Sequence, residues 1–348
     1  MAASRISLAD IARRADVHIT TVSLALRDSP RLPSTTKTRI QALAREMGYQ
    51  PDPMLSALIA YRGNAKIKQT QGTLAWITGT REIQFTLYFQ GAQERCQELG
   101  YKLDHFSLRE TGPARLSKVL WSRNIQGLLL APQIRNRAHL NLTWDKFSAV
   151  TFGFTLVRPQ LHVVTNAQYR SARMGMRMLR SRGYRRIGYV STHNTEERTD
   201  QNFSAGFTIE QARLKSSERI PPLILKDYSQ QEQLRDFSAW YRKHRPDAIL
   251  DHYNQIVKYK RELGISHEEC ALATLNRTTN ETELAGIDQN DLVIGRTAVD
   301  FVVGMIHRNE RGVPAIPFRI LVQGTWLDGK SVIRRSGKAS RDELAFSE

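Results

Sequence analysis

The chain has 348 residues, of which 41% are hydrophobic and 24% charged. At about 100–200 residues per domain, this length predicts two or three domains, and the composition is typical of a globular protein. No apolar run approaches the roughly 20 residues that a membrane helix needs, and the N-terminus lacks a signal-peptide core. Two cysteines, Cys96 and Cys270, provide neither a disulfide framework nor a metal set. We therefore expect a cytoplasmic protein that uses no cofactor and does not contact a membrane.

Positive charge dominates the ionic balance. Lys and Arg number 51 against 34 Asp and Glu, a net charge of +17. Such an excess favours a polyanionic partner, nucleic acid before a membrane surface. Residues 1–62 hold nine basic and five acidic residues, which leaves about +13 for the remainder. Charge alone therefore does not locate a binding site, and a basic surface without any partner stays an alternative.

Three short helices are predicted in the first fifty residues. The first begins at a capping-box variant on Ser7 and ends near Ala15; the second covers Ile19–Leu26. The third runs from a Ser34 cap to Met47. Two short helices joined by about three residues describe a helix-turn-helix, whose second helix enters the major groove of DNA. A purely structural three-helix bundle would show the same apolar stripes.

The outward face of the second helix supplies the candidates for contact with DNA bases. Its residues are Ile19, Thr20, Ser23 and Leu24, with His18 at the start of the helix. A further short helix is expected over residues 53–62, apolar on nearly every side, followed by a polar linker over residues 63–72. So short a helix is not stable alone in water, and it needs a symmetry mate, a DNA groove, or both.

Residues 5–62 resemble the DNA-binding headpiece of the LacI/GalR family of bacterial transcription regulators. The resemblance rests on Ile6–Ala12, Val17, Thr21–Ser23, Thr38–Ile40 and Met47–Pro51. It implies that the apolar segment is a hinge helix that folds on the operator and that Leu58 enters the minor groove as a wedge. The expected DNA-binding set is completed by Ser7, Thr21 and Arg27.

Three positions depart from the family's pattern. Asp16 stands where a glycine is usual, His18 where a capping serine is usual, and Leu24 where an arginine commonly reads a base. Apolar side chains at Ile19 and Leu24 favour contact with thymine methyl groups over guanine readout. The operator should therefore differ from the best-known ones, while the docking mode should not.

The rest of the chain alternates strands and helices in two series. Strands are expected at 74–77, 101–106, 127–131, 183–190 (a turn plus a strand) and 248–250, and helices at 89–100, 119–123, 169–182 and 203–214. Repeated βαβ units imply parallel sheets covered by helices, and two series imply two lobes. Stretches 182–188, 205–207, 245–250, 262–265 and 294–300 resemble the sensor body of the same family, which is like a periplasmic sugar-binding protein.

The resemblance implies a domain order and a place for a ligand. The expected parts are a helix-turn-helix domain (1–52), the hinge helix (53–62), the linker (63–72), an effector-binding and dimerisation domain (73–335) and a polar tail (336–348). Within 73–335, the N-lobe is expected at about 73–163 and 292–322, and the C-lobe at about 164–291 and 323–335. Ligands of such lobes bind at the carboxyl ends of the strands, in the cleft between them.

Seven residues are candidates for effector binding. Tyr228 and Asn276 match the family's contacts, Tyr253, Asn254 and Gln289 match by spacing, Phe203 stands where an effector-holding arginine is common, and Arg198 is its candidate substitute. An aromatic ring with amides and hydroxyls suits a sugar or another small polar solute. The charge of the body also admits an anionic effector, such as a sugar acid or phosphate. Packing is the alternative role of each single residue.

An enzyme is not predicted, because the sequence contains no Gly-rich phosphate loop, paired metal-ligand histidines or nucleophile elbow. The charge run Glu196–Asp200 is expected to be a solvated loop. His267–Cys270 is only a weak metal pattern, and Cys270 is expected to lie in the core.

The predicted fold class is an N-terminal all-α helix-turn-helix headpiece with a hinge helix, followed by an α/β, periplasmic-binding-protein-like body of two parallel-sheet lobes. The predicted function is a sequence-specific repressor that binds a pseudo-palindromic, double-stranded operator as a homodimer under control of a sugar-like effector. Residues 336–348 lack heptads, so a tetramerising coil is not expected. Two alternatives stay open: a regulator with no small-molecule effector, and a solute-binding protein without regulation.

Overall fold

The computed structural model describes residues 8–26, 32–47, 49, 71–252, 255–277 and 282–335. They belong to two compact units, one within residues 1–69 and the other within residues 70–348. The expected hinge helix, most of the linker and the polar tail lie outside the described residues. So do the candidate residues Ser7, Arg27, Leu58, Tyr253 and Asn254.

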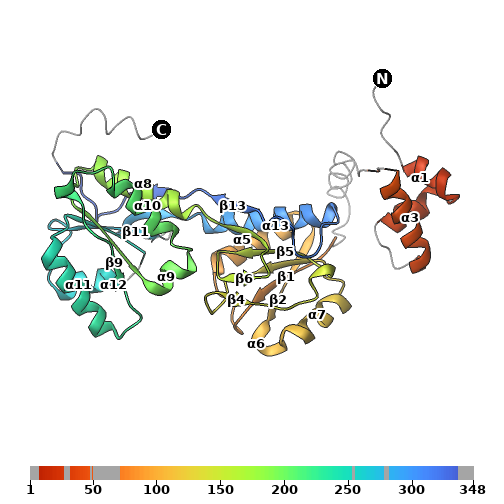
Figure 1. Ribbon diagram of the computed structural model, residues 1–348, viewed down its shortest axis with the longest axis horizontal. Helices are drawn as coiled ribbons and strands as arrows, with labels where there is room; N and C mark the ends of the chain where they lie inside the picture. Colours follow the sequence, from red (N-terminus) through yellow and green to blue (C-terminus); the bar gives the residue numbers. More distant parts are fainter. Residues whose placement is uncertain are drawn as a thin grey trace, which may run out of the picture. The chain divides into compact units, whose positions relative to one another are not determined.

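The headpiece, residues 8–49, contains the three helices that the sequence predicts. They are α1 (Leu8–Ala15), α2 (Ile19–Leu26) and α3 (Ser34–Glu46) (Figure 1). The apolar stripe of each helix meets the others at Ile11, Val22 and Ile40, whose side chains are fully buried. Asp16 turns the chain between α1 and α2 with a φ of 53°. Aspartate is among the few residues enriched in this left-handed region, which explains how it replaces a glycine here.

The prediction that Ser34 caps α3 is wrong. The N-cap is Pro33, which has φ −56° and ψ 143° and supplies no side-chain cap. Its carbonyl accepts the backbone N–H of Lys37 at 3.1 Å, so the helical hydrogen bonds begin one residue earlier than expected. Ser34 is already helical, and its own carbonyl accepts the hydroxyl of Thr38 at 3.0 Å.

The first lobe of the body is built on a six-stranded sheet in the order β13-β7-β5-β3-β1-β2, with all neighbours parallel. Its strands are β1 (Gly72–Thr78), β2 (Tyr101–Ser107), β3 (Gly127–Leu130), β5 (Ser148–Phe152), β7 (His162–Asn166) and β13 (Arg319–Val322). Its helices are α5 (Thr86–Glu98), α6 (Leu108–Thr111), α7 (Pro113–Ser122) and α13 (Asp291–His307), and β4 (Ala138–His139) pairs with β6 (Leu156–Arg158) beside the sheet. Alternate residues of β1 enter two different apolar clusters, so both faces of the sheet are covered.

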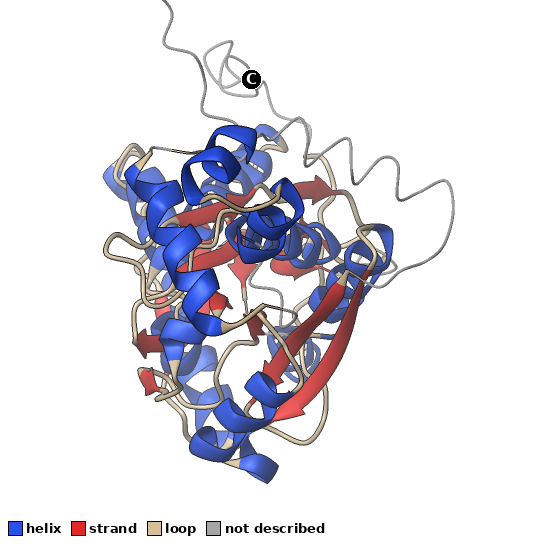
Figure 2. Cartoon of the chain, turned by 90° about the vertical axis from the view of Figure 1, so that its right-hand side faces the viewer, coloured by secondary structure: helices blue, strands red, loops and turns tan. Residues whose placement is uncertain are grey.

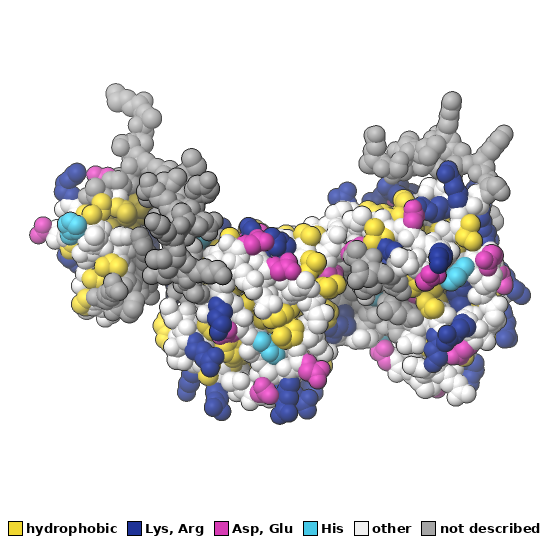
Figure 3. Space-filling view, turned by 180° about the vertical axis from the view of Figure 1, so that it is seen from behind, with side chains coloured by type: hydrophobic (Ala, Val, Ile, Leu, Met, Phe, Trp, Pro, Cys, Tyr) yellow, Lys and Arg dark blue, Asp and Glu magenta, His cyan; other side chains and the backbone are white. Residues whose placement is uncertain are grey.

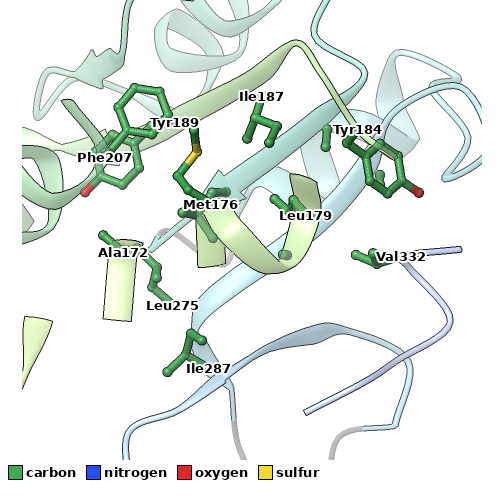
Figure 4. Close-up of a cluster of buried hydrophobic side chains, with 14 of the residues drawn as sticks. Ala172, Met176, Leu179, Tyr184, Ile187, Tyr189, Phe207, Leu275, Ile287 and Val332 are labelled. Carbon is green, nitrogen blue, oxygen red and sulfur yellow. The ribbon is translucent and has the colours of Figure 1, made fainter. Parts of the chain in front are cut away.

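The second lobe has a sheet in the order β14-β12-β11-β10-β8-β9, parallel except for β14. Its strands are β8 (Ile187–Thr192), β9 (Leu223–Leu225), β10 (Ala248–Asp251), β11 (Ala271–Arg277), β12 (Ala285–Asp288) and β14 (Thr325–Leu327). Its helices are α8 (Gln168–Ser181), α9 (His193–Arg198), α10 (Asn202–Gln211), α11 (Gln230–His244) and α12 (Gln255–Glu262). Figure 2 shows helices lying around the strands. One core of this lobe joins Met176 of α8, Tyr189 of β8 and Phe207 of α10 (Figure 4).

Several boundaries of lobes, helices and loops in the structure differ from those expected from the sequence. β7 belongs to the first sheet as far as Asn166, so the chain leaves the first lobe a few residues after the expected position at 163–164. α5 begins at Thr86 rather than at Phe89, because Phe85 before it has a φ of 58° and ends the preceding loop. The run Glu196–Asp200 is not simply a solvated loop, since α9 contains Glu196, which is only 6% exposed.

Helices α5 and α13 approach each other closely through two glycines. A Cβ on Gly91 would lie 2.1 Å from the carbonyl oxygen of Leu292, and a Cβ on Gly295 would lie 2.0 Å from that of Tyr88. Neither backbone atom can move aside without separating the helices. The two glycines therefore allow the close approach of α5 and α13 in the first lobe.

Replacement of Gly295 by alanine should destabilise the body. We expect Gly295→Ala to lower the free energy of unfolding by about 1–3 kcal/mol, the usual cost of overpacking, in urea titrations. Gly304→Ala on the same helix is the control, because its Cβ would meet only the flexible end of Arg308, at 3.0 Å. Alanine is about 1 kcal/mol better than glycine in a helix, so the control should be neutral or more stable. Equal stability of the two variants would contradict the close helix contact.

Candidate nucleic-acid interface and interlobe site

Helix α2 presents one face to the headpiece core and the other to solvent. Val22 and Ala25 are fully buried, while Ile19 is 41% exposed. Thr20 is also exposed, and Thr21, Ser23 and Leu24 are half-buried. An exposed isoleucine beside a hydroxyl offers both an apolar contact and a hydrogen bond, which are the two interactions that read bases in a major groove.

His18 acts as the cap of α2. Its Nδ1 lies 3.4 Å from the backbone nitrogen of Thr20 and 2.8 Å from the hydroxyl oxygen of the same residue. The histidine therefore replaces a capping serine without loss of the cap, and it adds an exposed ring at the start of the helix.

Two side chains of α3 hold the ends of the other helices. Gln41 donates from Nε2 to the carbonyl oxygen of Ala25 at 2.9 Å, and Arg39 donates from Nη2 to that of Ala15 at 3.3 Å. Both acceptors lie in the last turn of a helix, where carbonyls have no intrahelical partner. This role of Gln41 is not apparent from the sequence, since only the tertiary packing brings its side chain to α2.

A cavity lies where carboxyl ends of strands from both lobes come together. It is largely open to solvent, has a volume of about 500 Å³, and is lined by Gln84, Phe85, Ile134 and Arg198. Gln84 and Phe85 lie between β1 and α5, Ile134 follows β3, and Arg198 closes the helix that follows β8. This is the location that the sequence predicts for a ligand, and it brings one of the seven candidate residues, Arg198, to the cavity.

The lobes contact each other directly beside this cavity. Arg198 donates from Nη1 to the carbonyl oxygens of Gln133 at 2.9 Å and Ile134 at 3.2 Å, and to Oδ1 of Asn136 at 3.3 Å. The amide of Asn136 donates in return to Asn194 at 3.0 Å and to Glu197 at 2.8 Å. We call this set of contacts the interlobe clasp.

Arg198 has neutral partners. Among the residues that the structure describes, Arg198 forms no ion pair with a carboxylate. Burial lowers the pKa of its guanidinium, because the charge is partly removed from water. The cavity is thus bordered by a cation whose charge is solvated by dipoles and is not neutralised by a carboxylate.

Two other candidate residues lie inside the second lobe. Phe203 is fully buried in the core, and its ring centroid lies 4.7 Å from that of His252. Gln289 is 3% exposed; it accepts the hydroxyl of Ser171 at 3.2 Å and donates to the carbonyl of Leu275. Both side chains are used for internal packing, so as placed they present little surface to a solute.

Tyr228 and Asn276 are exposed. Tyr228 is 52% exposed, with the ammonium of Lys226 5.6 Å from its ring centroid. Asn276 has its backbone N–H bonded to the hydroxyl of Thr274 at 3.2 Å, whereas its neighbour Arg277 is buried and donates to the carbonyl of Leu284 at 2.6 Å. The buried side chain of Arg277 therefore links β11 to the chain just before β12.

A buried polar group near the end of β8 was not predicted from the sequence. Tyr189 donates its hydroxyl to Glu196 at 2.7 Å, and His252 lies nearby with its pKa lowered to about 4 by burial. The histidine is therefore neutral at pH 7. In the sequence, the one indication of this cluster of Tyr189, Glu196 and His252 is the position of Glu196, about one helical turn after the end of β8.

We find neither a metal-binding cluster nor a membrane-spanning helix among the described residues. They contain no group of three or more His, Cys, Asp or Glu side chains that could hold a metal ion. Cys270, at the end of the weak metal pattern, is fully buried in an apolar cluster, as predicted. None of the described helices is long and apolar enough to cross a membrane.

Comparison with known proteins agrees with this geometry. Residues 7–52 match the family described as bacterial regulatory proteins, lacI family. The HTH-type transcriptional repressor PurR of Escherichia coli O1:K1 is 24% identical over 259 residues, which are 70% of this chain and 71% of that protein. PurR of Escherichia coli O45:K1 (strain S88) matches with the same identity and coverage.

Solved structures of similar fold cover most of the chain. The lac repressor dimer bound to operator and the anti-inducer ONPF has a TM-score of 0.57 at 15% identity, over 95% of this chain and 100% of that one. The regulator CelR in complex with cellobiose has a TM-score of 0.54 at 16% identity, over 94% and 100%. A LacI-family regulator from Silicibacter pomeroyi has a TM-score of 0.51 at 20% identity, over 94% and 100%. Residues 7–52 therefore form a DNA-binding domain similar to that of the lacI family, the body has the fold of these solved regulators, and the chain is a DNA-binding transcription regulator.

Proposed function

We propose that this regulator is a cytoplasmic repressor and not an enzyme, and that it binds a pseudo-palindromic, double-stranded operator as a homodimer. The relatives named PurR are transcriptional repressors, and one structural neighbour is a dimer bound to its operator. A second element of the proposal is control by a small molecule that binds between the lobes. It is supported by the neighbour that holds cellobiose and by the cavity beside Arg198.

The exposed face of α2 is the observation that carries the DNA-binding proposal. Ile19, Thr20, Ser23 and Leu24 enter the major groove in this proposal, while His18 and Thr21 contact the groove edge or the backbone. The exposed imidazole of His18 is a polar ring at the start of α2 that a phosphate or a base edge can contact. Ser7 and Arg27 complete the set, and Leu58 is the minor-groove wedge; these three lie outside the described residues.

The effector that fits the cavity best carries an anionic group on a sugar-like body. The guanidinium of Arg198 borders the cavity without a carboxylate partner, and charge-assisted hydrogen bonds to an anion are stronger than those to carbonyls. The ring of Phe85 also lines the cavity and provides an apolar face. The other residues proposed to contact the effector are Phe203, Tyr228, Tyr253, Asn254, Asn276 and Gln289.

A regulator without a small-molecule effector is the second candidate. Phe203 fills the place of an effector-holding arginine and packs on His252 inside the core. The clasp also joins the lobes through the chain's own side chains. A protein partner or constitutive repression would then replace a ligand. A solute-binding protein without regulation is disfavoured by the LacI-family domain at residues 7–52.

Selection of bound duplexes from random DNA tests the proposed function. The wild-type chain should enrich a palindrome with a kinkable central step, and Leu58→Ala should lose that central preference. Ile19→Ala should weaken binding to the selected site about tenfold or more, since a lost base contact costs about 1–3 kcal/mol.

Thr35→Ala is the matched control for the headpiece. Thr35 is exposed on α3 and has no place in the proposed interface, so its affinity for the selected site should equal that of the wild type. If the wild type enriches no sequence, or if Thr35→Ala weakens binding as much as Ile19→Ala, the proposed interface is wrong.

A thermal-shift screen of paired neutral and anionic forms of the same sugars tests the effector. A ligand at 100 times its dissociation constant adds about 2.7 kcal/mol of stability. We expect an anionic form to stabilise the wild type and Asn136→Ala, which keeps the guanidinium, but not Arg198→Gln. If the neutral form of a sugar stabilises the protein more than its anionic form, the proposed anionic effector is contradicted. If no compound of a broad library stabilises the protein, the regulator without an effector is favoured.

Asn136→Ala should loosen the interlobe clasp. The variant loses the two amide hydrogen bonds to α9 and one acceptor of Arg198. Because these groups are partly exposed, we expect a cost of about 1 kcal/mol, or roughly fivefold faster local opening by hydrogen exchange in residues 133–136 and α9. Gln93→Ala, an exposed position on α5, should leave these rates unchanged. Unchanged rates in Asn136→Ala would show that the clasp does not hold the lobes.

A further inference from the structure

One face of helix α7 exposes a tryptophan to solvent. Trp121 is 47% exposed, whereas the other tryptophans of the chain are buried or half-buried. The opposite face of α7 is used in the core of the first lobe, where Leu116 and Leu120 are fully buried. Exposure of so large an apolar ring to water costs free energy. Trp121 is therefore a candidate for contact with another molecule.

Basic side chains surround this ring. Arg115 and Lys118 are exposed on α7, and Lys118 lies one helical turn from both Arg115 and Trp121. Lys146, in the short turn η1 (Trp144–Lys146), has its Nζ 4.7 Å from the centroid of the Trp121 ring. We call Arg115, Lys118, Trp121 and Lys146 the tryptophan face. Figure 3 shows Lys and Arg side chains along the lower edge of the first lobe, the level at which Figure 1 labels α6 and α7.

The cations of the tryptophan face have no carboxylate partner among the residues that the structure describes. Of the acidic side chains near them in the sequence, Glu110 pairs with Arg81 at 3.1 Å, and Asp145 is exposed. Like charges one turn apart destabilise a helix, so Arg115 and Lys118 would gain from an anionic partner. The tryptophan face thus combines a positive charge with one large apolar ring.

The topology of the first lobe separates this face from the cavity. A helix that connects two parallel strands runs back from the carboxyl edge of the sheet to the amino edge, and α7 lies between β2 and β3 in the chain. Trp121 belongs to the last turn of α7 and hence lies toward the amino edge. Ile134, which lines the cavity, follows the carboxyl end of β3. A molecule bound to the tryptophan face therefore does not occupy the cavity.

The chemistry of the face fits an acidic segment of a protein. Tryptophan and arginine are enriched among the contacts that carry most of the energy of protein interfaces, and the cations around the ring complement carboxylates. A single-stranded nucleic acid is bound through several aromatic rings on which successive bases stack, whereas this face offers one ring. A membrane surface needs the apolar face of a helix, and that of α7 is buried in the core.

We propose that the tryptophan face docks an acidic protein segment that carries one aromatic or large aliphatic side chain. This apolar side chain packs on the ring of Trp121, and carboxylates on either side of it bond to Arg115, Lys118 and Lys146. The docking surface shares no residue with the DNA-binding helix α2 or with the lining of the cavity. It gives the regulator a place for a partner protein beyond its proposed operator and effector.

Selection from a random library of short peptides tests the proposal with the full chain. Peptides that bind the immobilised wild type are then passed over Arg115→Gln/Lys118→Gln/Trp121→Ala, which removes those that bind elsewhere. The peptides that require the face should contain several Asp or Glu residues around one aromatic or large aliphatic residue. If no peptide requires the face, or if those that do lack acidic residues, the proposal is wrong.

Two smaller variants separate the ring from the charges. Trp121→Ala should weaken binding of the best selected peptide about tenfold or more, because truncation of a central aromatic contact is among the costliest changes in an interface. Arg115→Gln/Lys118→Gln alters only exposed side chains, which preserves the fold, and should weaken binding more at low salt than at high salt. Unchanged binding in either variant would overturn the proposed contact.

Arg170→Gln/Lys215→Gln is the control of equal charge change. Both residues are exposed in the second lobe and lie outside the tryptophan face. This variant should bind the selected peptide as tightly as the wild type. An equal loss of affinity in the control and in Arg115→Gln/Lys118→Gln would reduce the effect to net charge and overturn the face as a site.

Competition with nucleic acid identifies the class of partner. A single-stranded oligonucleotide of random sequence should leave the labelled peptide on the wild-type chain, as read by fluorescence anisotropy, whereas the unlabelled peptide should displace it. Displacement by the oligonucleotide at a lower concentration than by the unlabelled peptide would assign the face to nucleic acid. That result would overturn an acidic protein segment as the partner.

Discussion

Parallel strand pairing determines where the chemistry of the body lies. Neighbouring strands that run in one direction bring their carboxyl ends, and the loops that follow them, to one edge of the sheet. In the first lobe this edge carries Phe85 and Ile134, and in the second lobe it carries Arg198. The cavity and the interlobe clasp both follow from this single constraint, because it brings Arg198 to the carbonyls of Gln133 and Ile134, which lie more than sixty positions away in the chain.

The departures from the family's pattern in the headpiece are compatible with its fold. Asp16 adopts the left-handed conformation that a glycine would use, and His18 supplies through Nδ1 the acceptor that a serine hydroxyl would supply. Both substitutions keep the turn and add a larger polar side chain at the surface. The same scaffold thus presents a different surface to DNA, which fits an operator of its own.

The sequence predicts the helices of the headpiece well because each stripe is a local signal. The bounds of α2 and the end of α1 agree with the expectation, since apolar spacing is set within a few residues. The cap of α3 was wrong, because proline and serine both suit a helix start and only the backbone angles decide between them. The two-lobed body was also predictable, from repeated strand–helix alternation.

The interlobe site was only partly predictable, for a physical reason. The role of Arg198 depends on Gln133, Ile134 and Asn136, which lie more than sixty residues away in the other lobe. No local pattern encodes such a contact. In the same way, Phe203 has the right spacing for a ligand contact, but its apolar side chain gains more free energy in the core than beside a polar solute.

Arginines in the second lobe are held in two different ways. Arg173 and Arg177 on α8 pair with the carboxylate of Glu210, so a negative charge lies directly beside each guanidinium. Arg198 is held by carbonyl and amide oxygens beside a cavity and is partly removed from water, so dissolved ions screen its charge less and no carboxylate balances it. The proposed anionic effector would meet this second kind of charge, and its binding should therefore change little with salt.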